Sequence, residues 1–284
     1  MEINHRGKIN LSLHIIKKRQ DGYHCIDTLM QEVDVTDCLV IERAKNTRLF
    51  CDHPDVPTDE SNLILRAHRA LDARYGIGAA AFTLQKRIPV GAGMGGGSAN
   101  AAAALRGLNK LFALGLSKDE LAEIGLLLGA DVPFFLTGGT CRAQGIGEEL
   151  TPLPAYRMPV LLVNDGTHAQ TRAVYTYGPE HTPSTIPALI TQLQAGKTEL
   201  TVRNDLQKAA FHLYPKIRTT MEKVKETAPD TVQLSGTGAT IYAIYKTLTE
   251  AKRAHDALYG RFPMVVLTQT CGEDASGQQT DRYF

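Results

Sequence analysis

The run of glycines from Gly91 to Gly97 constrains the fold of this chain more than any other stretch. It holds five glycines, and the helix-forming segment Ser98–Leu105 follows directly. Glycine adopts positive φ without steric cost, so such a backbone can curl until several N–H groups point at one anion. The free N–H groups and positive dipole end of the following helix favour the same negative charge. The stretch therefore predicts a phosphate site that binds a nucleotide.

Two alternatives remain for this stretch. Its G-x-G-x-x-G pattern also occurs in Rossmann dinucleotide sites, which carry an acidic residue about 20 residues later, after a second strand. Here the next acidic residues, Asp119 and Glu120, begin an expected helix instead. A flexible loop without a ligand is the other alternative. A P-loop is excluded, because the stretch lacks the lysine of G-x-x-x-x-G-K-[ST].

Composition is that of a globular chain with no strong charge preference. The 284 residues are 43% hydrophobic and 21% charged, which is ordinary for a globular protein. The formal net charge of +1 gives no reason to expect nucleic acid or an anionic membrane as a partner. A chain of this length predicts one large or two medium domains.

The cysteines and the N-terminus favour a cytoplasmic protein. Five cysteines are present and no two form C-x-x-C, which argues against a disulfide framework or a zinc site. Residues 1–6 carry no apolar signal region, and no apolar run approaches the length of a membrane span. We therefore expect the cytoplasm as its location.

The expected elements fall into two domains, 1–152 and 153–284, because three prolines between Pro152 and Pro159 indicate a link. In the first domain we expect a strand hairpin over 9–15 and 28–42, a helix that begins at Ser61 or Asn62, a strand over 79–86, and a helix from a Ser117–Glu120 capping box to Gly129. In the second we expect strands over 160–163, 232–234, 241–245 and 265–268. We also expect helices over 184–197, over 205–227 with Pro215 as the place of a bend, and from a Thr249 cap to Leu258. The polar tail over 272–280 is expected to be mobile.

Asp131 is the acidic residue with the most unusual surroundings. It follows the end of a helix and precedes Val132, Phe134 and Phe135. A carboxylate in an apolar setting is costly unless it is paired or functional. A local cap or salt bridge is the plain interpretation, and a catalytic acid or base is the alternative.

Three stretches together resemble the motifs of the GHMP kinase superfamily, which includes galactokinase, homoserine kinase and mevalonate kinase. They are Gly7–Leu11, Pro89–Ala99 and Ser235–Ala239. The middle stretch is similar to the family's P-x-G-x-G-L-G-S-S-A loop, with Met94 in place of the leucine. Two further stretches, Asp21–His24 and Gly129–Phe135, resemble the branch whose acceptor is CDP-methylerythritol, in non-mevalonate isoprenoid biosynthesis. A departure from the pattern is His5-Arg6-Gly7, where the family carries an apolar residue, proline and alanine.

The resemblance implies an α+β fold of two domains, a ribosomal-protein-S5-like N-terminal domain and a smaller α/β-plait-like C-terminal domain. It implies an ATP-dependent kinase that phosphorylates the 2-hydroxyl of CDP-methylerythritol. Asp131 would take the proton of that hydroxyl, and Lys8 would pair with Asp131. Another GHMP kinase of the homoserine or mevalonate type, and a non-catalytic nucleotide-binding regulator, are the alternatives.

The binding residues also follow from the resemblance. ATP would be held by Asn62, Lys86, Pro89, Val90, Gly91, Ala92, Gly93, Met94, Gly95, Gly96, Gly97, Ser98 and Ala99. The acceptor would be held by Asn10, Tyr23, His24, Thr171, Tyr175, Gly236 and Gly238, with Tyr177 as the alternative to Tyr175 beside the cytosine. Mg²⁺ is expected with ATP, and Ser98 is its candidate ligand. We expect a monomer or homodimer that binds this small molecule and neither nucleic acid nor membrane.

Overall fold

The computed structural model describes residues 1–271 and divides them into two compact units. The first unit contains residues 1–7, 35–90 and 95–137, and the second contains 8–34, 91–94 and the chain from 138 onward. The expected polar tail lies outside the described residues. The domain boundary expected after residue 152 stays a prediction.

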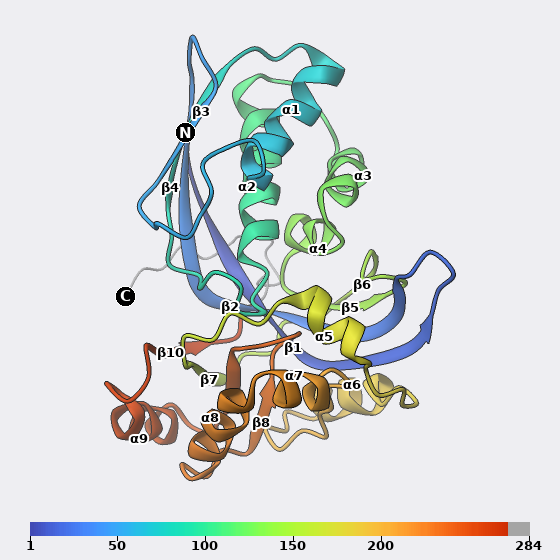
Figure 1. The fold of residues 1–284 in the computed structure, drawn as a ribbon, viewed down its shortest axis with the longest axis vertical. Coiled ribbons are helices and arrows are strands. Elements are labelled where there is room, and N and C mark those ends of the chain that lie inside the picture. Colours follow the sequence, from blue (N-terminus) through green and yellow to red (C-terminus); the bar gives the residue numbers. More distant parts are fainter. Residues whose placement is uncertain (272–284) are drawn as a thin grey trace. The chain divides into compact units, whose positions relative to one another are not determined.

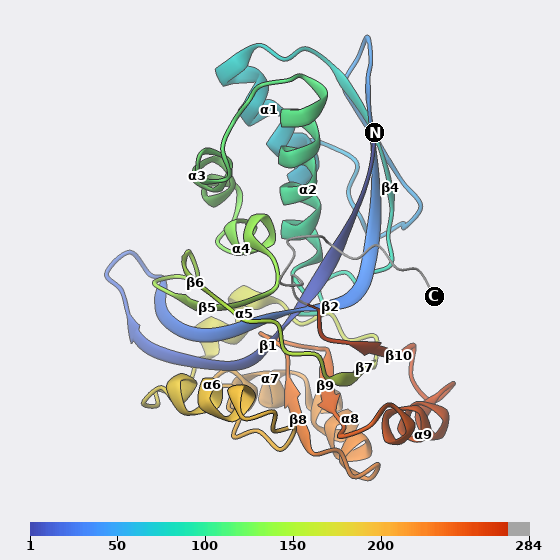
Figure 2. The same ribbon diagram turned by 180° about the vertical axis from the view of Figure 1, so that it is seen from behind.

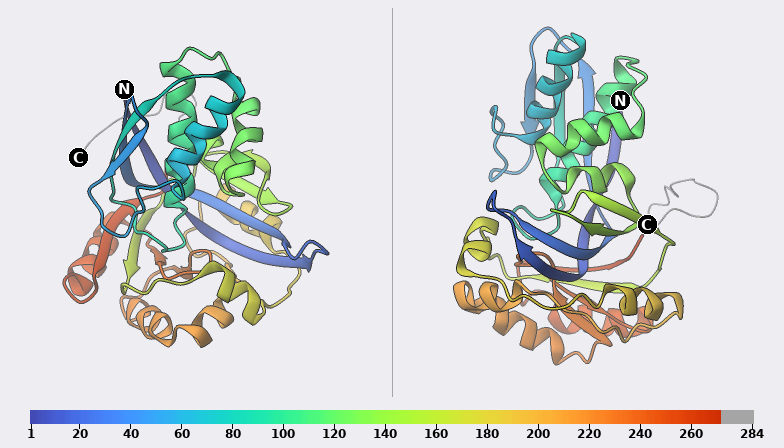
Figure 3. Two further views of the ribbon diagram at one scale, coloured as in Figure 1. Left: turned by 45° about the horizontal axis from the view of Figure 1, so that its top comes forward. Right: turned by 90° about the vertical axis from the view of Figure 1, so that its right-hand side faces the viewer.

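Two long strands run through both units, β1 (Glu2–Lys18) and β2 (His24–Arg43), and they pair with each other as the expected hairpin. Figure 3 shows them side by side in blue. Both are longer than the sequence predicts, so Lys8 lies inside β1 and not before it. Only the Asp21-Gly22 turn region separates them, with Gly22 at φ 88°.

The first unit places helices beside a short part of the sheet (Figure 1). In it β2 pairs antiparallel with β4 (Ala80–Gln85), and β4 pairs parallel with β3 (Arg48–Cys51). The helices are α1 (Leu63–Tyr75), α2 (Gly96–Leu111), α3 (Lys118–Leu128) and α4 (Val132–Thr137). A β-carbon on Gly107 of α2 would lie 2.3 Å from Ile41 Cδ1 of β2. Glycine therefore allows this close approach of α2 to the strand, and a side chain here would displace the end of the Ile41 side chain.

The cap residues of the first unit agree with the sequence in two places. Asn62 caps α1, because its side-chain oxygen accepts a hydrogen bond from the backbone N of Ile64. Ser117 and Glu120 form the expected capping box of α3, and Gly129 follows its last turn. Helix α4 was not expected from the sequence.

The second unit is built on a four-stranded antiparallel sheet in the order β10-β7-β9-β8 (Figure 2). These strands are β7 (Pro159–Asn164), β8 (Thr231–Leu234), β9 (Ile241–Ile244) and β10 (Met264–Gln269). Within the same unit β2 also pairs with β5 (Thr140–Gln144), and β5 pairs with β6 (Glu149–Leu153). The helices are α5 (Thr171–Tyr177), α6 (Ile186–Gln194), α7 (Gln207–Leu213), α8 (Pro215–Lys225) and α9 (Leu248–Leu258).

Two helix predictions for the second unit are corrected. The helix expected over 205–227, with Pro215 as the place of a bend, is two helices that separate at this proline, because Tyr214 before Pro215 adopts a non-helical conformation (φ −133°, ψ 74°). The last helix is capped by Thr247 and not by Thr249, since Thr247 and Glu250 form a capping box. The core of this unit includes Leu161, Val163 and Ile241 from the sheet.

Candidate active site

The glycine loop has the backbone that the sequence predicts. Gly91, Gly93 and Gly95 adopt positive φ of 64°, 75° and 68°. Helix α2 then begins at Gly96, so its first N–H groups follow the loop directly. In the first unit a β-carbon on Gly96 would lie 2.9 Å from Lys86 Nζ, and in the second unit one on Gly93 would lie 2.2 Å from the Ser235 carbonyl oxygen. A side chain is thus excluded at Gly93 by backbone, whereas one at Gly96 would have to displace the end of the Lys86 side chain.

In the second unit, three sequence motifs meet around Gly93. Lys8 Nζ donates to Asn10 Oδ1 (2.7 Å) and to the Gly93 carbonyl oxygen (3.2 Å). Ser235 Oγ donates to that same carbonyl oxygen (2.9 Å), and the backbone N of Asn10 donates to Ser235 Oγ (3.3 Å). Lys8 and Asn10 are buried, with 4% and 2% of their surface exposed. Residues from each of the three stretches, Lys8 and Asn10, Gly93, and Ser235, therefore form one cluster in this unit.

Two polar residues of this cluster were not singled out from the sequence. Thr28 accepts a hydrogen bond from Asn10 Nδ2 (2.9 Å) and fixes the orientation of that amide. Asn204 Nδ2 donates to the carbonyl oxygens of Leu234 (2.9 Å) and Gly236 (2.7 Å) and so holds the turn that contains Gly236 and Gly238. Neither residue belongs to a recognisable motif, so only the fold identifies them.

Two aromatic pairs of the second unit involve residues that the resemblance singles out. The ring centroids of His24 and Tyr175 are 5.2 Å apart with a tilt of 36°. Tyr177 stacks instead on His212, at 4.4 Å. Tyr23 precedes His24 and is 60% exposed, so its ring is open to a ligand. The hydroxyl of Thr171, at the start of α5, lies 3.2 Å from that of Thr237.

The His24 ring is neutral at pH 7. Burial lowers the pKa of His24, and the neighbouring Lys18 and His181 lower it further. A neutral imidazole offers one hydrogen-bond donor and one acceptor. Such a ring can pair with a base edge that presents both groups.

In the first unit, Asn62 and Lys86 already have partners within the protein. Asn62 caps α1, and its Nδ2 donates to the Pro57 carbonyl oxygen (2.6 Å). Lys86 Nζ lies 2.6 Å from Asp37 Oδ2, and both side chains are buried. Burial lowers the pKa of Lys86, while the Asp37 carboxylate opposes that effect. Their expected contact with adenosine stays a prediction.

Asp37 organises the strand end that leads into the glycine loop. Its Oδ1 accepts hydrogen bonds from the backbone N of Arg87 (2.6 Å) and of Ile88 (2.8 Å). Its Oδ2 accepts from Asn100 Nδ2 of α2 (2.9 Å). His5 Nε2 lies 2.6 Å from Asn100 Nδ2, and burial lowers the pKa of His5 to about 4. This buried cluster ties residues on both sides of the loop within the first unit.

Asp131 lies directly before α4 and is half-buried, in the first unit. A β-carbon on nearby Gly129 would lie 3.7 Å from Ser98 Oγ, so the segment before Asp131 lies beside the start of α2. Pro89, Val90 and Ala99 belong to the first unit as well. Lys8 belongs to the second unit, so its pairing with Asp131 stays a prediction.

Comparisons with known proteins identify the family of this chain. Two family models match, the GHMP kinases N terminal domain over residues 62–139 and the GHMP kinases C terminal over residues 183–263. The chain therefore belongs to the GHMP kinase family, and within it to the group of relatives called 4-diphosphocytidyl-2-C-methyl-D-erythritol kinase. The expected two-domain α+β architecture is confirmed.

Three relatives illustrate the match. The relative from Thermoanaerobacter pseudethanolicus is 36% identical over 93% of this chain and 94% of its own. That from Alcanivorax borkumensis is 40% identical over 84% and 80%. A crystal structure of 4-(cytidine 5'-diphospho)-2C-methyl-D-erythritol kinase is 32% identical, with a TM-score of 0.83 over 96% of this chain and all of that one. A homoserine kinase from Cytophaga hutchinsonii, 17% identical with a TM-score of 0.68, shares the fold alone.

Proposed function

We propose that this protein transfers the γ-phosphoryl group of ATP to the 2-hydroxyl of 4-diphosphocytidyl-2-C-methyl-D-erythritol, which gives the 2-phosphate and ADP in isoprenoid precursor biosynthesis. The observation that carries the proposal is the pairing of His24 with Tyr175, in a chain whose glycine loop is of the GHMP type. A homoserine or mevalonate acceptor has no base for these rings to hold. The identity to relatives of that name supports the same acceptor.

The base of the acceptor would lie against the aromatic residues of the second unit. Tyr175, next to His24, is a better candidate for stacking than Tyr177, whose ring is already stacked on His212. Exposed Tyr23 would supply the opposite ring. His24, neutral at pH 7, would donate to and accept from the cytosine edge. Asn10, Thr171, Gly236 and Gly238 would contact the rest of the acceptor.

Phosphoryl transfer depends mainly on positioning and on stabilisation of charge. The loop from Pro89 to Ala99 would hold the phosphates with its N–H groups and the start of α2. The acceptor hydroxyl would give its proton to the Asp131 carboxylate as the oxygen attacks the γ-phosphorus. Lys8, whose ammonium touches the Gly93 carbonyl oxygen, would keep that carboxylate ionised.

Mg²⁺ fits the residues at the start of α2. Ser98 Oγ makes no hydrogen bond within residues 1–271, so a hard oxygen donor is available there. The same residues contain no cluster of three His, Cys, Asp or Glu that could hold a metal. Ser98 would therefore hold the ion together with phosphate oxygens and water, and the ion would neutralise phosphate charge.

The cytoplasm is proposed as the location because all five cysteines are free thiols, as in proteins of reducing compartments. Within residues 1–271, no helix combines the length and apolar character that a membrane crossing requires. We propose that the protein is a monomer or a homodimer and that it binds no nucleic acid.

An acceptor comparison tests the proposed function. ADP release from ATP and Mg²⁺ is measured with CDP-methylerythritol, homoserine and mevalonate in separate reactions. We expect release with the first acceptor alone. Release with homoserine or mevalonate instead would establish a different GHMP kinase, and ATP binding without release for any acceptor would indicate a regulator.

A further inference from the structure

The second unit contains a cavity whose lining shares only Asn204 with the candidate active site described above. Its volume is about 390 Å³, within the range of small-molecule sites. It lies between the segment that contains Glu180, the residues from Val202 to Phe211 and the end of β8. Among the lining residues only Val202 and Phe211 are apolar, whereas most small-molecule sites are lined by hydrophobic side chains.

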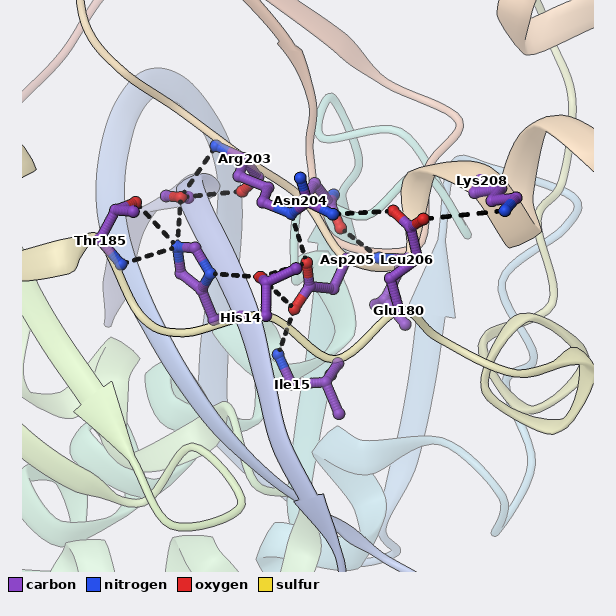
Figure 4. A network of polar contacts seen from close by, with 11 residues as sticks. His14, Ile15, Glu180, Thr185, Arg203, Asn204, Asp205, Leu206 and Lys208 are labelled. Atoms are coloured by element: carbon purple, nitrogen blue, oxygen red, sulfur yellow. Dashed lines mark hydrogen bonds and ion pairs between the residues drawn. The ribbon is translucent and has the colours of Figure 1, made fainter.

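The rim of the cavity is positively charged. Arg203, Lys208 and Arg218 line it with a single acidic residue, Glu180. Arg203 donates to Glu180 Oε2 (2.9 Å) and to Asp205 Oδ1 (2.8 Å), and Lys208 Nζ lies 3.8 Å from Glu180 Oε1 (Figure 4). Glu180 and Asp205 together balance two of the three cations. The rim therefore keeps an excess of positive charge, and Arg203 is held in place by its two carboxylate partners.

Arg218 is exposed, with its guanidinium 5.5 Å from the ring centroid of Phe211. This guanidinium makes no ion pair within the described residues. A guanidinium that packs on an aromatic ring is oriented while its N–H groups stay available to an oxyanion.

Two amides in the cavity have unused hydrogen-bonding capacity. Gln207 Oε1 is buried and accepts no hydrogen bond from any described residue. Gln233 is 7% exposed; its Oε1 accepts from the backbone N of Leu234 (2.7 Å), whereas its Nε2 donates to no described residue. Of these two atoms only Gln207 Oε1 is fully buried, and because buried polar atoms nearly always have a partner, we expect a group in the cavity to donate to it. One acceptor and one donor are thus available beneath the cationic rim.

We propose that this cavity binds a small organic phosphate that carries a hydroxyl group. The phosphate lies at the rim, where Arg218 and Lys208 donate to its oxygens. The hydroxyl reaches the amides, where it donates to Gln207 Oε1 and accepts from Gln233 Nε2. The site is separate from the glycine loop, and the proposal does not depend on the acceptor proposed above.

Calorimetry with three probes tests the site: glycerol 3-phosphate, inorganic phosphate and glycerol. All are titrated into the full chain with saturating ADP, so that the glycine loop is occupied. We expect glycerol 3-phosphate to bind about twentyfold more tightly than inorganic phosphate, the size of two neutral hydrogen bonds. Glycerol alone is expected not to bind measurably.

Two variants separate the phosphate and hydroxyl contacts. Arg218→Glu is expected to lower the affinity for both glycerol 3-phosphate and inorganic phosphate about tenfold or more, because a cation becomes an anion. Gln207→Leu is expected to weaken the binding of glycerol 3-phosphate about fivefold, the size of one neutral hydrogen bond, and to leave the binding of inorganic phosphate unchanged. It should also raise Tm slightly, because it removes an unsatisfied buried oxygen. Arg253→Glu, at an exposed position of α9, is the control, because it changes the net charge by the same amount away from the cavity.

The outcomes are distinct. If Arg218→Glu binds neither glycerol 3-phosphate nor inorganic phosphate and Arg253→Glu binds both normally, the result supports the site, even if the acceptor proposal fails. Absence of binding by the unaltered chain, or equal loss in both charge variants, overturns it. Gln207→Leu with an unchanged preference for glycerol 3-phosphate also overturns it, because the amide would then only contact water.

Discussion

Ser235 Oγ donates a hydrogen bond to the carbonyl oxygen of Gly93 at 2.9 Å, which joins the last glycine turn to the nucleotide loop within the second unit. The two residues are 142 positions apart in the chain. Lys8 Nζ approaches the same oxygen at 3.2 Å. One backbone carbonyl thus receives donors from two distant motifs, and the conformation of the loop depends on both.

Gly93→Ala is expected to abolish ATP binding. The new β-carbon would lie 2.2 Å from the Ser235 carbonyl oxygen, at a residue with φ of 75°. The loop must therefore move away from the turn that supports it. The measurement is ATP affinity by calorimetry.

The matched control for this prediction is Gly76→Ala. Gly76 also has positive φ (61°), but its β-carbon would meet nothing within 4 Å. It should lower stability by about 1 kcal/mol and leave ATP affinity unchanged. If Gly93→Ala bound ATP as well as Gly76→Ala does, the close approach to Ser235 would be irrelevant to the loop.

Tyr175→Leu is expected to raise KM for CDP-methylerythritol about fivefold or more, because stacking on a base contributes about 1–3 kcal/mol. KM for ATP should not change. Tyr177→Leu is the matched control, since Tyr177 stacks on His212 and not on His24. Steady-state kinetics with each substrate varied would measure both effects. A larger effect of the Tyr177 variant would transfer the stacking role to that residue.

His5 is expected to make stability depend on pH between about 7 and 4. Burial lowers the pKa of His5 from 6.5 to about 4 in the folded protein. In that pH range the unfolded chain binds more protons, so the free energy of unfolding falls as pH is lowered. The loss attributable to this residue is up to about 3 kcal/mol at pH 4.

Urea unfolding at several pH values measures this dependence. His5→Gln, which cannot titrate, should lose less stability on acidification than the unaltered chain. His181→Gln, at an exposed position, should follow the unaltered chain. If the free energy of unfolding depended on pH equally in all three proteins, His5 would not be the group responsible.

Local sequence signals predicted much of the fold. The positive-φ glycines, the Asn62 cap and the Ser117–Glu120 box depend on residues a few positions apart, and each is present in the structure. The Thr249 cap was wrong although the stronger T-x-x-E pattern at Thr247 was available. Helix α4 was missed because its six residues are too short to show a helical period.

The candidate site was predicted less completely, because its supports come from distant segments. The motifs identified Lys8, Asn10 and the glycine turn, and the structure joins them in one unit. Asn204 has no motif around it. Its hydrogen bond to the Gly236 carbonyl oxygen joins residues 32 positions apart and exists only once the chain has folded. The resemblance suggested Tyr175 or Tyr177, and the contact with His24 favours the former.

The most direct test is ADP release from ATP and Mg²⁺, with and without CDP-methylerythritol, by the unaltered chain and by Asp131→Asn. We predict release that depends on the acceptor, and a fall of about 10²–10⁴-fold in kcat for the variant, the usual contribution of a general base. ATP binding by the variant, measured by calorimetry, should be nearly normal. Near-normal kcat in Asp131→Asn, or release that does not respond to the acceptor, would contradict the proposed reaction and its base.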